Sequence, residues 1–350
     1  MPEQITTTIV DEKETPSHTI TDGGDISGSE SEKESQDPNK ADADEEEAAD
    51  DQQDLLGEYA DTETRIELMH SRVDSLLDLG LERFTGLEYL GCRQNLIKDL
   101  SPLSTLTSLR EVDFYDNRLG RVDASVGLLT GLSSLDLSFN KIRRIENVAS
   151  LARLEELFFV SNKIETIENL GALCMLTNLE LGANRIRRIE GLGELVALEQ
   201  LYLGKNKIAK LEGLENLRRL RVLSIQSNRL LAIEGLEHLA ALEELYLSHN
   251  GIAHIEGLEN NSRLTILDVT SNRLTELAGV GHLAQLEDLW ASGNQLASFE
   301  NVERACGALA ALRTVYLEFN PLQRAQPASY RRKVMLALPQ VTQIDATLCR

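Results

Sequence analysis

The sequence predicts a solenoid of the α/β class, in which about twelve short coils stack on one another and share a curved parallel sheet. Two observations predict it. Eleven asparagines recur at spacings of 22 residues, apart from 23 before Asn140 and 26 before Asn320. Apolar residues occupy the same positions around every asparagine, and this pattern continues from residue 65 to residue 320. The asparagines are Asn95, Asn117, Asn140, Asn162, Asn184, Asn206, Asn228, Asn250, Asn272, Asn294 and Asn320.

The repeat unit is clearest around Asn162. The chain from Leu154 to Leu176 follows the pattern L-x-x-L-x-L-x-x-N-x-I-x-x-I-x-x-L-x-x-L-x-x-L, with Phe159 at the third leucine position. This is the leucine-rich-repeat pattern in its short, 22-residue form. Because one such repeat cannot bury its apolar face alone, eleven in register predict a continuous stack.

Each part of the repeat predicts one structural element. The segment L-x-x-L-x-L alternates and predicts a short strand whose leucines point into the stack. The asparagine follows the strand, where its amide can pair with buried backbone groups of neighbouring coils. A recurring Glu-Gly-Leu, such as Glu190 to Leu192, fits a tight bend into a short helix on the back. Strands on one side and wider helices on the other predict a convex helical face and a concave sheet.

The two ends of the array depart from the pattern. Leu68 to Asp78 preserves it weakly, with Val73 where the asparagine belongs, and we interpret it as a degenerate first repeat that caps the stack. After Asn320 the rhythm breaks, and Tyr330 to Leu338 has helical periodicity that Pro339 ends. The sequence therefore predicts a solenoid over residues 65–320 and a carboxyl-terminal cap over residues 321–350.

The first 64 residues have a different composition. Their only basic residues are Lys13, Lys33 and Lys40, and they include an acidic run over residues 42–51, so they contribute most of the net charge of −22. A segment with few large apolar residues cannot offset chain entropy, and we expect residues 1–64 to be disordered. Serines followed three residues later by glutamate make candidate sites for an acidophilic kinase; the alternative is an unmodified acidic segment. These serines are Ser27, Ser29 and Ser31.

Composition and motifs exclude several classes of function. The chain starts without the basic end and apolar stretch of a signal peptide, and no apolar run is long enough for a membrane span. The four cysteines show no paired spacing, and Cys92 takes a core position of the repeat, which favours burial over redox or metal chemistry. Phosphate-loop, nucleophile-elbow and histidine metal motifs are absent. We expect an intracellular, non-enzymatic protein without a metal or cofactor.

The concave face is predicted by counting back from each asparagine. Residues four and six positions earlier should point out of the sheet, away from the leucine core, so that their substitution leaves the fold intact. The first row is Gly91, Asp113, Asp136, Phe158, Glu180, Tyr202, Ser224, Tyr246, Asp268, Trp290 and Tyr316. The second row is Tyr89, Glu111, Ser134, Glu156, Asn178, Gln200, Val222, Glu244, Ile266, Asp288 and Thr314.

These 22 positions hold eight carboxylates, no lysine or arginine, and the only tryptophan of the chain. Aromatic residues amid acids favour a protein-binding surface for a basic partner. The alternative is that strands favour aromatic residues and solvated faces are charged. Nucleic acid is disfavoured, since phosphate contacts need basic residues on the contacting face. The pairs Arg143-Arg144 and Arg187-Arg188 follow the asparagines and are expected to be solvated edges.

Several segments resemble one family closely. They include ENVASLARLEELFFVSNKIETIENL, IEGLENNSRLTILDVTSNRL and YRRKVMLALPQVTQIDAT, and the resemblance to the leucine-rich-repeat regulatory subunit of type-1 protein phosphatase runs from about residue 66 to the end. The resemblance implies a non-catalytic subunit that grips the phosphatase catalytic subunit with its concave face. The matching contact positions are Asp136, Phe158, Glu180, Tyr202, Asp268, Asp288, Trp290 and Tyr316.

Two of these positions depart conservatively from the family, which commonly has Phe at Tyr202 and Glu at Asp288. The resemblance also implies a ternary complex with a phosphatase inhibitor and a location in the nucleus and cytoplasm. The alternative function is a leucine-rich-repeat scaffold for a splicing, tubulin or axonemal complex. Splicing would favour a basic surface facing RNA, and the other two usually bring further domains.

Overall fold

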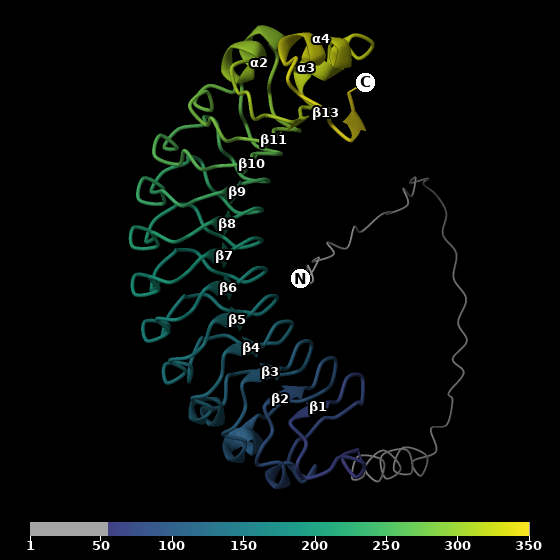
Figure 1. Ribbon diagram of the computed structural model, residues 1–350, viewed down its shortest axis with the longest axis vertical. Helices are drawn as coiled ribbons and strands as arrows, with labels where there is room; N and C mark the ends of the chain where they lie inside the picture. Colours follow the sequence, from purple (N-terminus) through teal and green to yellow (C-terminus); the bar gives the residue numbers. More distant parts are fainter. Residues whose placement is uncertain (1–54, 350) are drawn as a thin grey trace, which may run out of the picture. The chain divides into compact units, whose positions relative to one another are not determined.

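The computed structural model describes residues 55–349, which form a curved stack of coils (Figure 1). Strands β1 to β12, each three residues long, pair in parallel, each with the next in sequence. They are β1 Arg65–Glu67, β2 Tyr89–Gly91, β3 Glu111–Asp113, β4 Ser134–Asp136, β5 Glu156–Phe158, β6 Asn178–Glu180, β7 Gln200–Tyr202, β8 Val222–Ser224, β9 Glu244–Tyr246, β10 Ile266–Asp268, β11 Asp288–Trp290 and β12 Thr314–Tyr316. The predicted solenoid with a concave parallel sheet is confirmed.

The core is a set of apolar ladders that run through the stack. The middle residue of each strand, such as Leu135 or Leu157, is fully buried, and the leucines of the turns are buried as well. Burying each such side chain stabilises the fold by about 1.5–3 kcal/mol. Cys92 lies in this core, as predicted, and burial raises the pKa of its thiol above the usual range. That thiol therefore stays protonated at neutral pH.

The asparagines hold neighbouring coils together. Asn184 is representative: its Nδ2 donates to the carbonyl oxygens of Phe159 at 2.8 Å and Leu181 at 3.0 Å. Its Oδ1 accepts from the backbone N–H of Ile164 at 3.0 Å. The preceding residue, Ala183, is left-handed with φ 54°, which turns the chain so that the amide faces inward. The predicted structural role of the repeat asparagines is confirmed.

The first repeat is two residues longer than the sequence pattern suggested. Arg65 pairs with Tyr89, which is 24 residues further along the chain. The N–H of Val73 donates to Oδ1 of Asn95 just as the N–H of Ile97 donates to Oδ1 of Asn117. Val73 therefore corresponds to the apolar residue two positions after the asparagine, and placing it at the asparagine position was wrong. Ser71 stands there instead, and the count of twelve repeats holds.

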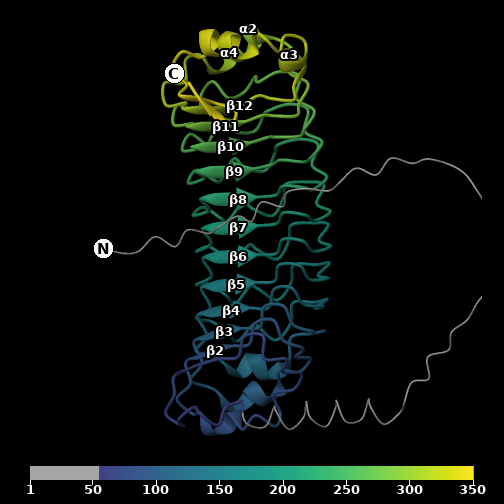
Figure 2. The ribbon, with the colours of Figure 1, turned by 90° about the vertical axis from the view of Figure 1, so that its right-hand side faces the viewer.

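The convex side contains fewer helices than predicted. Within residues 55–349, helical backs occur near the two ends, as Figure 2 shows: η1 Leu81–Arg83, η2 Ser101–Thr105, η3 Ala124–Leu128 and α2 Phe299–Cys306. Central repeats use consecutive turns instead, in which Leu173 N–H donates to Leu170 O and Leu176 N–H donates to Leu173 O. Leucines three residues apart suit turns with three residues each, whereas an α-helix repeats every 3.6 residues. The 26-residue repeat has four extra residues and forms α2.

The glycine of the recurring Glu-Gly-Leu makes the bend into this back, as predicted. Gly213 has φ +70°, and a Cβ there would lie 2.6 Å from the carbonyl oxygen of Ile189 in the previous repeat. Gly191, Gly235 and Gly257 have the same geometry. The backbone conformation and the close packing of coils therefore both require glycine.

The carboxyl-terminal end is sealed by a cap of different structure. It contains α3 Pro321–Arg324, α4 Tyr330–Ala337, β13 Gln343–Ile344 beside β12, and the antiparallel strand β14 Thr347–Leu348. The Asp345 carboxylate accepts from the backbone N–H groups of Leu317 and Glu318 at 2.9 and 3.1 Å. In an inner repeat the N–H equivalent to Leu317 donates to the carbonyl of the next coil, as Phe159 does to Glu180. The Asp345 carboxylate thus takes the place of the backbone acceptor that a further coil would provide.

At the amino-terminal end the folded part starts earlier than the predicted boundary at residue 64. Leu56 is only 3% exposed and joins the core, and the Arg83 guanidinium donates to its carbonyl oxygen. Residues 55–64 are therefore part of the repeat body and not of the acidic segment. The rest of the predicted disordered segment, with Ser27, Ser29 and Ser31, lies outside the described residues. None of the helices in residues 55–349 has the length and apolar character needed to cross a bilayer.

Candidate functional site: the concave sheet face

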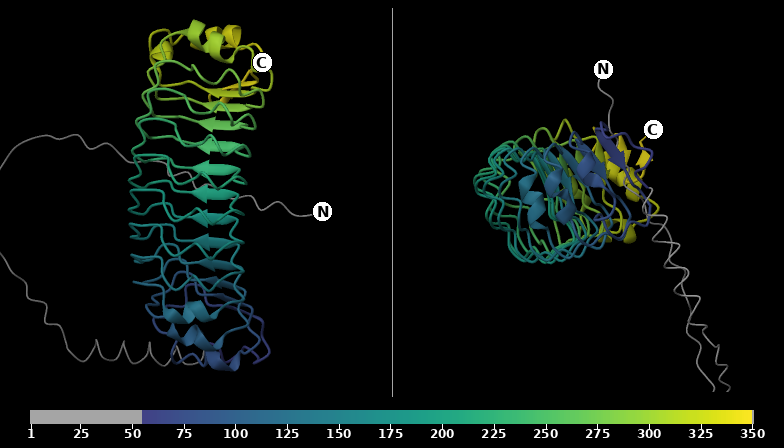
Figure 3. Two further views of the ribbon diagram at one scale, coloured as in Figure 1. Left: turned by 90° about the vertical axis from the view of Figure 1, so that its left-hand side faces the viewer. Right: turned by 90° about the horizontal axis from the view of Figure 1, so that it is seen from below.

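The strands place both predicted rows on one face. Each strand buries its middle residue and turns its first and third residues out of the sheet, and these are the residues six and four positions before the asparagine. The third residues lie in register, with Asp268 beside Trp290 and Trp290 beside Tyr316. The left panel of Figure 3 shows the strands that carry them stacked as a ladder. The eight predicted contact residues therefore share one face.

These eight residues fall into two groups along the sheet. Asp136, Phe158, Glu180 and Tyr202 end the consecutive strands β4 to β7. The second group occupies β10 to β12 and consists of Asp268, Asp288, Trp290 and Tyr316. Strands β8 and β9 separate the groups and contribute Ser224 and Tyr246 at the same position.

The second group is built around Trp290. Its ring lies 6.1 Å from the rings of both Tyr246 and Tyr316, centroid to centroid, and meets Tyr316 edge-on at 72°. A hollow of about 430 Å³ opens beside it, lined also by Ser292 and by Phe319, which is 57% exposed. Tyr246, Ser292 and Phe319 were not among the predicted contact residues. Phe319 lies on the loop after β12, directly before Asn320, a repeat position that the two predicted rows did not include.

Two polar atoms beside this hollow lack hydrogen-bond partners among the described residues. They are Nε1 of Trp290 and Oγ of Ser292, and both are buried. A buried donor without an acceptor costs about 1–3 kcal/mol.

The first group carries two carboxylates, Asp136 at the end of β4 and Glu180 at the end of β6. Burial raises the pKa of Glu180, and the neighbouring charges of Asp136 and Glu156 raise it further. Burial also raises the pKa of Asp136, although hydrogen bonds from Ser138 act in the opposite direction. Among the described residues Glu180 forms no ion pair. Keeping these carboxylates ionised therefore costs free energy in the free protein, and a cationic partner would reduce that cost.

Replacing Glu180 with glutamine is expected to stabilise the fold at neutral pH. A carboxyl whose folded pKa is raised binds its proton more tightly when folded, so stability falls as pH rises from the ordinary pKa of a glutamate through the raised value. The gain from Glu180→Gln should therefore be full at pH 7 and disappear below the ordinary pKa. Urea unfolding at several pH values measures it. A gain of the same size at low and neutral pH would contradict the electrostatic cause.

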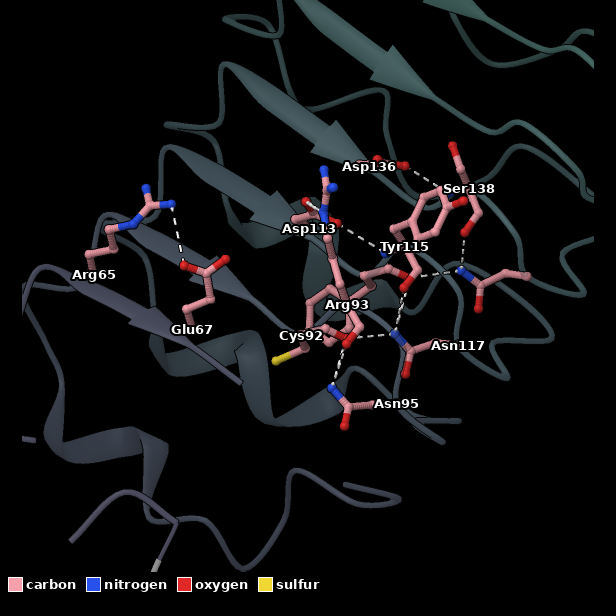
Figure 4. Close-up of polar contacts among 12 residues, drawn as sticks. Arg65, Glu67, Cys92, Arg93, Asn95, Asp113, Tyr115, Asn117, Asp136 and Ser138 are labelled. Carbon is pink, nitrogen blue, oxygen red and sulfur yellow. Dashed lines mark hydrogen bonds and ion pairs between the residues drawn. The ribbon is translucent and has the colours of Figure 1, made fainter. Parts of the chain in front are cut away.

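The amino-terminal end of the face is less acidic than predicted, because β1 adds Arg65. The Arg65 guanidinium lies 3.5 Å above the ring of Tyr89 and 3.8 Å from Glu67. Arg93, on the loop after β2, forms an ion pair with Asp113 (Figure 4). Both basic residues thus neutralise acids of the same face. The sequence pattern missed Arg65 because the first repeat was aligned two residues out of place.

The aspartates of the first row also have a structural role, which corrects one expectation. Oδ1 of Asp136 accepts from the backbone N–H of Ser138 at 2.8 Å, and Oδ1 of Asp268 accepts from that of Thr270 at 2.9 Å. Asp268 is only 6% exposed. Each carboxylate fixes the turn that leads to the asparagine. Substituting these aspartates with alanine would therefore disturb the fold as well as the surface.

The described residues contain no group of three or more His, Cys, Asp or Glu side chains arranged to hold a metal ion. The acidic side chains of the face are spread along successive strands and do not converge on one point. The arrangement is thus an extended contact surface with one aromatic hollow.

A curved parallel sheet, an asparagine ladder between coils and an exposed polar and aromatic inner face define a leucine-rich-repeat protein. The family "Leucine Rich repeats (2 copies)" matches residues 174–216 and 196–238. An internalin from Listeria monocytogenes superposes with a TM-score of 0.65 at 23% identity, covering 86% of this chain and 95% of the internalin. A leucine-rich-repeat protein of Leptospira interrogans superposes with a TM-score of 0.61 at 25% identity, over 76% and 74%. These likenesses concern the fold.

Closer sequence relatives are subunits of protein phosphatase 1. The chain is 46% identical over 88 residues to "Protein phosphatase 1 regulatory subunit SDS22" of Saccharomyces cerevisiae, which is 25% of this chain and 26% of that protein. It is 68% identical over 40 residues to human "Protein phosphatase 1 regulatory subunit 7", 11% of each chain. The protein is a leucine-rich-repeat protein with homologues among these subunits, and the matched part spans about a quarter or less of their length.

Proposed function

We propose that the protein is a non-catalytic regulatory subunit that binds the catalytic subunit of type-1 protein phosphatase through its concave face. The observation that carries the proposal is the Trp290 cluster on a carboxylate-bearing sheet, in a chain whose relatives are named as regulatory subunits of that phosphatase. The eight contact residues implied by the resemblance lie on this one face.

The two groups of the face have different roles in this proposal. The hollow beside Trp290, Tyr316 and Phe319 receives an apolar side chain of the phosphatase, because large aromatic residues lose little conformational entropy and bury much area. Asp136 and Glu180, whose pKa values are raised mainly by burial and further by neighbouring carboxylates, meet lysine or arginine side chains that stabilise their charged forms. Aromatic burial thus supplies affinity, and the carboxylates supply orientation.

We further propose that the protein acts without a cofactor, joins a ternary complex with a phosphatase inhibitor, and is located in the nucleus and cytoplasm. These points rest on the resemblance to the family. The competing proposal is that the protein is a scaffold for a splicing, tubulin or axonemal complex. In that case the same concave face would bind a component of that complex.

Affinity purification of the full-length protein from its source cells tests the choice. With the wild type we expect the phosphatase catalytic subunit to be recovered and identified by mass spectrometry, and with Trp290→Ala we expect it to be depleted. Recovery of spliceosomal, tubulin or axonemal proteins without the phosphatase would favour the scaffold.

Deleting residues 1–54 is expected to leave the affinity for the phosphatase within a few-fold at physiological salt. Charges more than about 8 Å from their partners are screened under these conditions, and the proposed contacts lie on the sheet. Titration calorimetry of the truncated and full-length proteins measures the difference. The deletion must stop before Leu56, because that side chain packs in the core. A hundredfold loss would show that the acidic segment takes part in binding.

A further inference from the structure

A row of basic residues runs along the loops beyond the carboxyl ends of the strands. In six consecutive repeats the residue directly after the asparagine is lysine or arginine, and each is exposed or half-buried. We call this row the basic edge: Arg118, Lys141, Lys163, Arg185, Lys207 and Arg229. It does not belong to the concave face, whose residues lie on the strands before the asparagines.

The backbone holds these residues at a fixed spacing. The N–H of Lys163 donates to the carbonyl of Ile142 in the previous repeat, and the N–H of Arg185 donates to that of Ile164, both at 2.8 Å. The other four make the equivalent bond. With coils about 4.8 Å apart, as neighbouring strands are, the six cations occupy roughly 24 Å. Like charges at this spacing repel one another, and solvent screens that repulsion only in part.

Two arginines near the basic edge are neutralised by ion pairs within the protein. Arg144 and Arg188 each stand four residues after an asparagine, and each pairs at 3.1 Å with a glutamate of the next repeat, Glu168 and Glu212. By contrast, no side chain of the basic edge forms a hydrogen bond or ion pair with another residue of the described range 55–349. Within the described residues, the six side chains of the edge are thus not engaged in ion pairs.

The middle of the basic edge forms a hollow of about 520 Å³. Its lining includes Arg143, Arg144, Lys163 and Arg185 against two carboxylates, Glu165 and Glu168. Since Glu168 is paired with Arg144, the remaining lining carries a surplus of positive charge. Arg143 is exposed, as predicted for a solvated edge, and it lines this hollow together with Lys163 and Arg185.

We propose that the basic edge binds an acidic, extended segment of a partner protein, with its centre at the hollow beside Lys163 and Arg185. A peptide fits better than a nucleic acid because no aromatic side chain lines the hollow, so bases have no surface on which to stack. The site goes beyond the proposed function, because it leaves the concave face free.

Fluorescence anisotropy with the full-length protein and a fluorescein-labelled deca-glutamate peptide tests the proposal. The variant Lys163→Glu/Arg185→Glu should weaken binding at least tenfold. The control Arg218→Glu/Arg219→Glu changes the net charge equally at exposed turn residues on the back of a repeat and should weaken binding less than twofold. Lys163→Gln/Arg185→Gln, which removes charge without adding acid, should give an intermediate loss. Circular dichroism should match the wild type for all three.

Three results would overturn the proposal. The first is no binding of deca-glutamate to the wild type at low salt. The second is an equal loss in the Arg218→Glu/Arg219→Glu control, which would mean that net charge alone acts. The third is tighter binding of a labelled deca-uridylate that Lys163→Glu/Arg185→Glu abolishes, which would make the edge a nucleic-acid site. None of these results bears on the phosphatase, whose binding by the concave face is measured separately.

Discussion

The Trp290→Ala variant is expected to bind the catalytic subunit of type-1 phosphatase at least about 2 kcal/mol more weakly than the wild type, a loss of roughly thirtyfold. Trp290 is the centre of the aromatic cluster, with a tyrosine ring at 6.1 Å on either side, and it lines the hollow of about 430 Å³. Truncation removes the largest apolar surface that the face can bury. Titration calorimetry with the purified catalytic subunit measures the loss, and thermal unfolding checks that the fold persists.

The matched control is Tyr89→Ala. Tyr89 is also an aromatic residue on the concave face, but it lies on β2, outside both groups of contact residues. We expect it to change binding by less than about 0.5 kcal/mol, the range usual for a residue outside a hot spot. Normal binding by Trp290→Ala with an intact fold would rule out the concave-face mechanism.

For the carboxylates beside Trp290 the informative substitution is Asp268→Asn. The asparagine keeps an oxygen that can accept from Thr270 N–H while removing the charge, so the turn is retained. A binding loss in Asp268→Asn is therefore an electrostatic effect on the partner. The same loss in Asp268→Ala would mix that effect with damage to the turn.

Replacing Asn184 with leucine is expected to destabilise the repeat body by about 2 kcal/mol. The substitution leaves the N–H of Ile164, in the neighbouring coil, buried without a partner. It also removes one of the two hydrogen bonds to the carbonyl of Phe159, which keeps only that from Asn162 at 3.2 Å. Because each coil contacts only its neighbours, the damage should concentrate there. Urea unfolding measures the overall loss, and faster hydrogen exchange at the amide of Ile164 locates it.

Asn216→Leu is the control for this variant. Asn216 is an exposed asparagine in the next repeat, and its side chain donates to the carbonyl of Gly193 at 3.0 Å. Solvent can replace this bond, so we expect a change within about 0.5 kcal/mol. Equal unfolding curves for Asn184→Leu and Asn216→Leu would refute the role given to the asparagine ladder.

The repeat period made most of the face predictable. Since the asparagine lies at a fixed distance after the strand, counting back four and six residues identified the outward side chains. Seven of the eight contact positions that the resemblance implies lie in the first of these rows. The hollow beside Trp290 was not predicted, because only the positions four and six before each asparagine were considered. It also needs Phe319 and Ser292, which stand one and two positions before their asparagines, beyond the end of the strand.

The sequence by itself determined the fold class, the register of the strands and the buried ladder, because each depends on a local pattern that repeats along the chain. Only the tertiary structure decided which residue stands at the asparagine position of the 24-residue first repeat, since pairing with Tyr89 sets that register. It also separated the arginines that pair with the next coil from the basic edge, which has no such pair. The physical reason is the same in both cases. The partner of each group lies in the neighbouring coil, about 22 residues away in the sequence, and a local sequence pattern does not show whether the two groups come into contact.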